Sequence, residues 1–276
     1  MSAQIEPGCL KALSDRQAVR IIDGSWALDG TDMKALYGQS HIPGAVFFDL
    51  EAISDRSSPL PHMAPSPAQF ADAVGQMGVS ATDHVVIYDR QGLFSAARVW
   101  WTFKLMGHDK VQVLRGGLPA WQAEGLPVTD TVETPSHVTY PPHPTPEMAM
   151  GLEELRTVLK KGESVVLDAR PAGRFAGTVP EPRAGLRSGH MPGGRSLPFG
   201  ELISGGTLKP RAELEDILRD HGVVDGADIV TTCGSGVTAA IISLALYETG
   251  HKDTRLYDGS WAEWGQASLD TEVETA

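Results

Sequence analysis

One short segment combines residue types that could do chemistry. Residues 233–239 read CGSGVTA and follow the apolar run DIVTT. Cys233 is therefore expected at the end of a strand, with Gly234 and Gly236 behind it and a helix starting near Val237. Glycines let main-chain N–H groups turn toward a ligand, and a helix start adds unpaired N–H groups. Because such surroundings stabilise an anion, we interpret Cys233 as a reactive thiolate rather than a buried structural thiol.

Two hydroxyl groups in the same segment extend this chemistry. Ser235 and Thr238 can donate a hydrogen bond or relay a proton. We expect two of the loop residues to be catalytic, namely Cys233 and Ser235. We expect the others to bind the substrate, namely Gly234, Gly236, Val237 and Thr238.

The composition limits the possible partners and cofactors. The 276 residues are 41 % hydrophobic and 21 % charged, as in soluble globular proteins, and no apolar run is long enough to span a membrane. The net charge of −12 argues against nucleic acid or an anionic membrane as partner. No secretory leader is evident, which favours a cytoplasmic location. Two cysteines, Cys9 and Cys233, and nine histidines form no disulfide framework and no zinc-ligand spacing, so we expect no metal, and Cys9 is interpreted as a bystander.

The chain contains an internal repeat. RIIDGSW matches SVVLDAR, HIPGAVFF matches HMPGGRSLPF, HVVIYDRQGLFSAA matches DIVTTCGSGVTAA, and LRGGLPAW matches YDGSWAEW. Matched positions lie 143 to 149 residues apart, and Asp89 falls opposite Cys233. We therefore predict two homologous domains, residues 1–138 and 139–276. The proline-rich segment 126–147 between them is expected to be an extended linker.

Short apolar runs alternate with helix-period segments in each half. After Cys233 the apolar residues follow the i, i+3, i+4, i+7 spacing from Val237 to Leu244, and the pattern ends at Gly250. This alternation predicts an α/β fold, in which each domain is a parallel sheet with helices on both faces. Ligands of such sheets bind beyond the carboxyl ends of the strands, where Cys233 is expected.

The cysteine loop has three other interpretations. GSGVTA fits the G-x-G-x-x-A dinucleotide fingerprint, but it lies in the last predicted strand–helix unit, whereas a fingerprint normally opens the domain. A cysteine phosphatase would need an arginine six residues after Cys233, where the chain has Ala239. A non-catalytic binding module stays open, because the first half carries the same scaffold with Asp89 in place of the cysteine.

These features together resemble the rhodanese-type sulfurtransferases. The resemblance covers nearly the whole chain and rests on tandem domains, HxPG in each half, a Cys-led loop only in the second half, and the ending DGSWAEW. It implies two rhodanese-like domains, the first of them inactive because Asp89 cannot carry sulfur, and it implies no cofactor. Within the family, CGSGVTA looks like the loop of the branch that uses 3-mercaptopyruvate. The thiosulfate-using branch typically has basic residues where this chain has Gly234 and Ser235.

The resemblance also implies two substrate-binding arginines. GRFAGTVPEPR resembles the family segment whose first and last arginines grip the substrate carboxylate and ketone, here Arg174 and Arg183. Guanidinium groups suit this task because they bind a carboxylate through two parallel hydrogen bonds. Five arginines lie between residues 170 and 195 against the single acidic Glu181. We interpret the other three as ordinary solvated charges, namely Arg170, Arg187 and Arg195.

The histidines of the two HxPG turns, His41 and His190, are expected to be structural. In some members of the family an Asp and a His of the first domain assist the serine of the loop. The resemblance implies that Asp32 and His41 would assist Ser235 in this chain.

The mechanism that the resemblance implies has two covalent steps. Cys233 attacks the sulfur of 3-mercaptopyruvate, pyruvate leaves, and the persulfide passes its outer sulfur to cyanide or to a thiol such as a small thiol or thioredoxin. This predicts ping-pong kinetics. The expected partners are thus a small anionic sulfur donor and a thiol or cyanide acceptor. A thiosulfate:cyanide sulfurtransferase is the nearest alternative, and a non-catalytic binding or sulfur-relay module is the alternative of another class.

Overall fold

The computed structural model describes residues 2–16 and 19–275, which form two compact units. Unit 1 comprises Met1–Ser57, Ala64–Thr145 and Gly205–Leu208, and unit 2 comprises Ser58–Met63, Pro146–Ser204 and Lys209–Ala276. Each unit therefore includes one short segment from the other half of the chain. The sequence boundary at residue 139 stays a prediction.

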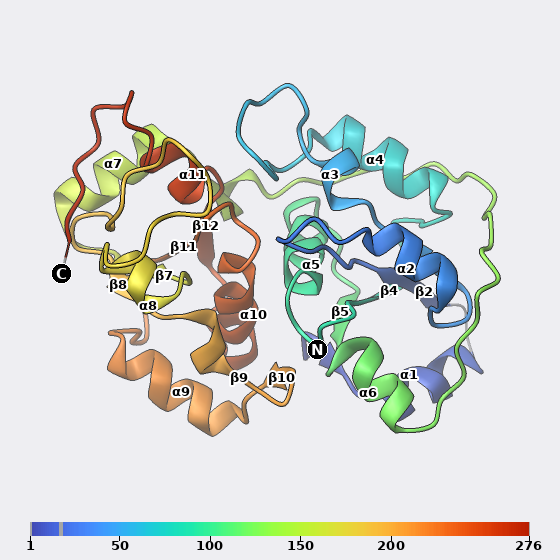
Figure 1. The fold of residues 1–276 in the computed structure, drawn as a ribbon. Helices are drawn as coiled ribbons and strands as arrows, with labels where there is room; N and C mark the ends of the chain where they lie inside the picture. The colour runs from blue at the N-terminus through green and yellow to red at the C-terminus, as the bar shows by residue number, and fades with distance from the viewer. Residues whose placement is uncertain (1, 17–18, 276) are drawn as a thin grey trace. The chain divides into compact units, whose positions relative to one another are not determined.

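Unit 1 is built on a five-stranded parallel sheet in the order β1-β5-β4-β2-β3 (Figure 1). Its strands are β1 (Gln4–Ile5), β2 (Val19–Asp23), β3 (Ala45–Phe47), β4 (His84–Tyr88) and β5 (Val111–Leu114). Its helices are α1 (Pro7–Ser14), α2 (Met33–Gln39), α3 (Leu50–Ile53), α4 (Pro67–Gln76), α5 (Ala96–Leu105) and α6 (Gly117–Ala123).

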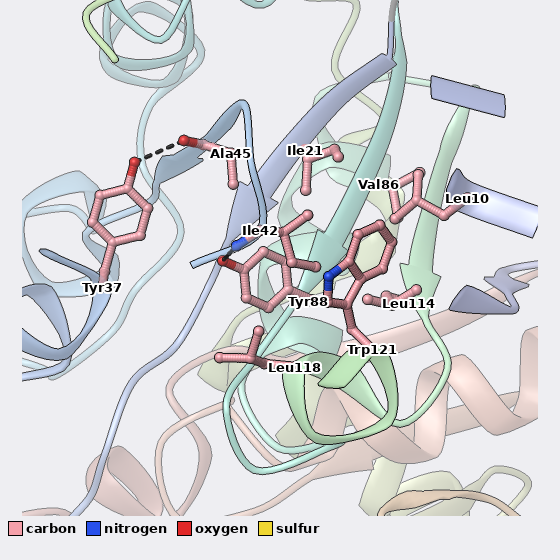
Figure 2. Close-up of a cluster of buried hydrophobic side chains, with 10 residues drawn as sticks. All are labelled: Leu10, Ile21, Tyr37, Ile42, Ala45, Val86, Tyr88, Leu114, Leu118 and Trp121. Atoms are coloured by element: carbon pink, nitrogen blue, oxygen red, sulfur yellow. Dashed lines mark hydrogen bonds between the residues drawn. The ribbon is translucent and has the colours of Figure 1, made fainter. Parts of the chain in front are cut away.

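One face of the unit 1 sheet is covered by α1 and α6. Leu10 of α1 and Trp121 of α6 belong to the same buried cluster as Val86 and Tyr88 of β4 (Figure 2). Ile87, which stands between Val86 and Tyr88, points to the opposite side, because side chains alternate along a strand. The apolar run of β4 is therefore buried on both faces, as in other parallel sheets.

The opposite face of the same sheet is covered by α5 and α4. A Cβ on Gly24, just after β2, would lie 3.2 Å from Ile87 of β4 and 2.9 Å from Val99 of α5, so strand and helix meet there without space for a side chain. Phe70 of α4 packs edge-on against Phe103 of α5, with 4.9 Å between the ring centroids.

Unit 2 repeats this plan with the sheet order β6-β12-β11-β7-β8, again parallel. Its strands are β6 (Ala149–Met150), β7 (Val165–Asp168), β8 (Arg195–Ser196), β9 (Ile203–Ser204), β11 (Ile229–Thr232) and β12 (Thr254–Tyr257). Its helices are α7 (Leu152–Lys161), α8 (Ala172–Phe175), α9 (Arg211–Asp220), α10 (Ala239–Thr249), α11 (Ser260–Trp264) and the 3-10 turns η1 (Pro146–Met148) and η2 (Phe199–Leu202). β10 (Thr207–Leu208) lies in the segment that belongs to unit 1.

Helices cover both faces of the unit 2 sheet as well. Val230 of β11 lies in a buried cluster with Leu155 of α7 and Trp261 of α11. The next residue, Thr231, points to the other face, where its Oγ1 lies 3.0 Å from Oγ of Ser243 in α10. The predicted α/β fold with two repeated units, each a parallel sheet between helices, is confirmed. No helix in the described part of the chain is long and apolar enough to cross a membrane.

The proline-rich segment between the halves lies along unit 1. Residues 130–145 contain no helix and no strand. They are held instead by backbone hydrogen bonds, from Val138 to the carbonyl of Gly75 at 3.0 Å and from His143 to that of Met106 at 3.0 Å. A Cβ on Gly107 would lie only 2.0 Å from the carbonyl oxygen of His143, so this close approach requires a glycine.

Leu10→Ala tests the buried cluster between the unit 1 sheet and the helices α1 and α6. Leu10 has no exposed surface, so its truncation should leave a cavity and lower the free energy of unfolding by about 2–5 kcal/mol. The same change at Leu28, which is 54 % exposed, should cost less than about 0.5 kcal/mol. Urea unfolding of both variants measures the difference, and equal costs would contradict the assignment of this core.

Candidate functional site

Cys233 follows directly on β11, at the carboxyl end of the unit 2 sheet. β11 lies between β7 and β12 and is parallel to both, so three strands end at the same edge. Cys233 is 2 % exposed. The loop that begins with it occupies the place where parallel sheets bind their ligands.

The backbone of the cysteine loop is fastened to the start of α11. The N–H of Cys233 donates to Oγ of Ser260 at 3.3 Å, and its carbonyl accepts from the N–H of Trp261 at 2.9 Å. The carbonyl of Gly234 accepts from the N–H of Ala262, also at 2.9 Å. Ser260 itself has a positive φ of 49°, a conformation that costs free energy outside glycine. The DGSWAEW motif thus holds the loop in one position.

Arg174 lies against this loop at a glycine. A Cβ on Gly234 would lie 3.0 Å from Nη2 of Arg174, which is tighter than an ordinary contact. The absence of a side chain at residue 234 therefore leaves the room that the guanidinium group takes. The side chain of Arg174 is 16 % exposed, so it is mostly shielded from water.

Arg174 is held there by a buried carboxylate. Nε of Arg174 donates to Oε1 of Glu181 at 3.1 Å, and Nη2 makes a short hydrogen bond to Oε2 of the same residue. Glu181 also accepts from Nη1 of Arg170 at 2.8 Å, and its side chain is only 1 % exposed. Arg170 in turn forms an ion pair with Asp168, the last residue of β7, at 2.7 Å.

Ser235 lies between an arginine and a histidine. Nη2 of Arg183 is 3.4 Å from its Oγ, at the long end of hydrogen bonding, and Nδ1 of His62 is 3.0 Å from the same atom. His62 is in the segment Ser58–Met63, which belongs to unit 2 although it comes from the first half of the chain. It has a positive φ of 60°. Its ring is 3 % exposed, so this contact is made away from water.

The last residues of the loop lead into α10. Gly236 has a φ of 77°, in the left-handed region that favours glycine. Val237 is buried, and Thr238 is the N-cap of α10, although its side chain makes no capping hydrogen bond. Within the described residues, the N–H groups of Ser235 and Thr238 donate to no backbone carbonyl. Such N–H groups are suited to an anion.

The matching loop of unit 1 already holds an anion of its own. The carboxylate of Asp89 accepts hydrogen bonds from the N–H groups of Gln91 at 2.9 Å, Phe94 at 2.7 Å and Ala96 at 2.9 Å. Burial raises the pKa of the Asp89 carboxyl, and these amide donors oppose the rise. At the repeat spacing of 144 residues, the three donors correspond to residues 235, 238 and 240.

The loop residues and both predicted arginines are therefore close to one another. Arg174 touches the loop at Gly234, and Arg183 touches it at Ser235. The interpretation of Arg170 as a solvated charge is wrong. Its side chain is fully buried, and its guanidinium carbon lies 4.1 Å from the ring centroid of Trp261.

The other two arginines of the segment are tied to backbone carbonyls. Arg187 donates to the carbonyl of Thr271 at 2.7 Å, and Arg195 donates to that of His221 at 2.8 Å. Arg187 therefore has a fixed structural position rather than a solvated one. Arg195 lies largely on the surface, as its interpretation supposed.

The histidines of the HxPG turns have structural partners. Nδ1 of His41 is 2.8 Å from the carbonyl of Tyr37, and its Nε2 is 3.2 Å from that of Thr131. Asp32 accepts from the N–H of Ala35 at 2.9 Å and caps α2. The histidine beside Ser235 is thus His62, and the assignment of this place to His41 is wrong. His190 stacks on Phe175 with 3.9 Å between the ring centroids.

Two residues of the site were not singled out from the sequence. His62 lies 173 residues before Ser235 and in no repeated motif, so no local signal marks it. Glu181 was visible only as the one acidic residue among five arginines. A single carboxylate among five arginines is expected to bind more than one of them, so this composition could have marked Glu181 in the sequence. In the described part of the chain, no cluster of three or more His, Cys, Asp or Glu side chains could hold a metal ion.

Comparison with known proteins gives a consistent set of similarities. A family model for the Rhodanese-like domain matches residues 6–124 and again residues 151–267. The chain is 42 % identical over 264 residues to a 3-mercaptopyruvate sulfurtransferase of Escherichia coli, covering 94 % of this chain and 93 % of that protein. It is 40 % identical over 269 residues to the Homo sapiens 3-mercaptopyruvate sulfurtransferase, covering 96 % and 91 %. The crystal structure of SseA from Escherichia coli, a 3-mercaptopyruvate sulfotransferase, superimposes with a TM-score of 0.87 at 38 % identity, covering 95 % of this chain and 100 % of that one.

Asp89→Ala tests whether the loop of unit 1 needs an anion. Removing the carboxylate leaves three N–H groups without their acceptor, of which that of Ala96 is buried and the other two are partly buried, so the free energy of unfolding should fall by about 2 kcal/mol. Added formate should raise the melting temperature of this variant more than that of the wild type. Asp109→Ala is the control, because the Asp109 side chain is 97 % exposed and should matter by less than about 0.5 kcal/mol. A variant as stable as the wild type would refute the role of Asp89.

Proposed function

Because this chain belongs to the rhodanese family, we propose that it is a sulfurtransferase that takes sulfur from 3-mercaptopyruvate and carries it as a persulfide on Cys233. The observation that carries the proposal is the position of Cys233 at a strand end, with the guanidinium groups of Arg174 and Arg183 against the same loop. Relatives that bear the name 3-mercaptopyruvate sulfurtransferase align with more than nine-tenths of the chain. The loop positions next to the cysteine, Gly234 and Ser235, are uncharged, which suits a donor with a single full negative charge.

Substrate binding is assigned to the two arginines and to the loop backbone. Arg174 and Arg183 bind the carboxylate and the ketone oxygen of the donor, since a guanidinium group can offer two parallel donors to planar oxygen groups. The N–H groups of Gly234, Gly236, Val237 and Thr238 face the negative charge on the sulfur atoms. The hydrogen bonds to the Asp89 carboxylate in the repeated loop support this role for Thr238 and extend it to Ser235, because the donors there, Phe94 and Gln91, correspond to these two residues.

The first step forms a sulfur–sulfur bond and breaks a carbon–sulfur bond. The Cys233 thiolate attacks the sulfur of 3-mercaptopyruvate, and the electron pair of the C–S bond moves to the pyruvate enolate. A proton then reaches the enolate carbon. We assign the transfer of this proton to Ser235, and the contacts of its Oγ with Nδ1 of His62 at 3.0 Å and with Nη2 of Arg183 at 3.4 Å support the assignment.

The second step returns the enzyme to its starting state. Cyanide or a thiol attacks the outer sulfur of the Cys233 persulfide, and the thiolate of Cys233 leaves. With cyanide the product is thiocyanate, and with a small thiol or reduced thioredoxin it is a new persulfide. A cytoplasmic location, expected from the sequence, stays a prediction.

Cys233→Ser should abolish the reaction. The variant should lose pyruvate release from 3-mercaptopyruvate by at least about a thousandfold, because a serine hydroxyl does not form a persulfide. Intact mass spectrometry after addition of the donor should show one added sulfur atom on the wild type and none on the variant. Cys9→Ser, at an exposed position, should behave like the wild type in both measurements. Turnover by Cys233→Ser, or a purified wild type that releases no pyruvate, would overturn the proposed function.

Arg174→Ala and Arg183→Ala should act mainly on binding of the donor. Each should raise the KM for 3-mercaptopyruvate by about tenfold or more, with a smaller change in kcat, because a charge-assisted contact to the carboxylate is lost. Arg219→Ala is the matched control, since Arg219 pairs with Asp216 on the surface of α9 and its side chain is 64 % exposed. Steady-state kinetics of pyruvate release measure both constants. An unchanged KM in both loop variants would remove the arginines from the substrate site.

A further inference from the structure

We propose that Glu181 positions Arg174 and sets the donor specificity of the loop by limiting its positive charge. The inference rests on the proposed function, because it assigns Arg174 to donor binding. Glu181 does not itself touch the cysteine loop in any contact described above. It acts through the arginine that does.

Glu181 fixes the guanidinium group of Arg174 in two directions. Its two oxygens accept from Nε, at 3.1 Å, and from Nη2, so the planar group is held along one edge. The held group lies so close to Gly234 that a Cβ there would be 3.0 Å from Nη2. An arginine side chain has large rotamer freedom, and this pairing removes it before the donor arrives.

The Glu181 carboxylate is itself held by a second arginine, Arg170. Oε1 of Glu181 also accepts from Nη1 of Arg170 at 2.8 Å. Arg170 pairs with Asp168 at the end of β7 and lies over the ring of Trp261. All of these charged side chains are at most 3 % exposed, apart from that of Arg174. The sheet therefore sets the position of Arg174 through a continuous chain of charge-assisted hydrogen bonds.

The same chain fixes the charge beside the cysteine. Arg170 and Arg174 pair with Asp168 and Glu181, so the four charges of this group balance. Charges interact strongly where water is excluded. Removing the charge of Glu181 would leave one positive charge of the group unbalanced beside Gly234. The added charge should favour thiosulfate, which carries two negative charges, over 3-mercaptopyruvate, which carries one.

The test compares Glu181→Gln with Glu181→Asp in the full-length protein. Both 3-mercaptopyruvate and thiosulfate serve as donors, cyanide is the common acceptor, and thiocyanate is measured. Gln keeps the shape and loses the charge, so the ratio of kcat/KM for 3-mercaptopyruvate to that for thiosulfate should fall by about tenfold. Asp keeps the charge, so its ratio should stay within about threefold of the wild type. Glu215→Gln, which removes an equally arginine-paired but exposed carboxylate, should leave the ratio unchanged.

A double-variant cycle separates positioning from a general loss of structure. If Glu181 acts through Arg174, Glu181→Asp should raise the KM for 3-mercaptopyruvate more than it lowers kcat. In the Arg174→Ala background the same change should have no further effect on KM. If Glu181→Gln does not fold, the comparison of Glu181→Asp in the two backgrounds tests the inference in its place. An effect of equal size in both backgrounds, or an unchanged donor ratio in folded Glu181→Gln, would overturn the inference.

Failure of this inference is distinguishable from failure of the proposed function. The wild type is tested first for pyruvate release and for one added sulfur atom on Cys233. If the wild type fails, the proposed function is wrong. If it passes and the Glu181 variants keep the wild-type donor ratio, only the role of Glu181 is wrong.

Discussion

Hydrogen bonds between the backbone of the cysteine loop and the start of α11 fix the path of the loop, and the other contacts of the site depend on that path. They use the carbonyls of Cys233 and Gly234, so the backbone leaves β11 along one path only. That path brings a glycine against Arg174 and puts Ser235 within reach of Arg183 and His62. Serine at residue 260 adopts an unfavourable backbone conformation and still supplies the hydroxyl that receives the N–H of Cys233. The backbone strain at Ser260 thus accompanies the hydrogen bonds that hold the cysteine loop in one conformation.

The repeated loops of the two units differ at their first residue, which is Asp89 in unit 1 and Cys233 in unit 2. In unit 1 the loop N–H groups bind the side chain of Asp89, a residue of the fold itself. In unit 2 the corresponding residue is Cys233, which we propose to carry a second sulfur atom. The loop amides of unit 1 donate hydrogen bonds to a carboxylate. This indicates that the equivalent amides of unit 2 can donate hydrogen bonds to a sulfur anion.

The repeat, the two parallel sheets and the place of the cysteine loop could all be predicted, because each depends on patterns local in the sequence. Arg174 and Arg183 were also predicted, since the segment that carries them resembles a family motif. The burial of Arg170 was not, because nothing near it in the sequence shows that Asp168 and the ring of Trp261 close over it. His62 was missed for the same reason, as its contact with Ser235 spans 173 residues. Long-range partners of polar groups depend on how the chain folds back, and residue spacing does not encode that.

The short segments that each unit takes from the other half make the two halves of the chain depend on each other. Residues 58–63 and 205–208 begin 147 residues apart, which is the spacing of the internal repeat, so they stand at equivalent positions. Each lies on the loop of the unit that receives it, where His62 contacts Ser235 and Gly206 approaches Gly92. A half cut off in the proline-rich connection would therefore carry Ser235 without the histidine that contacts it, because His62 belongs to the other half of the chain.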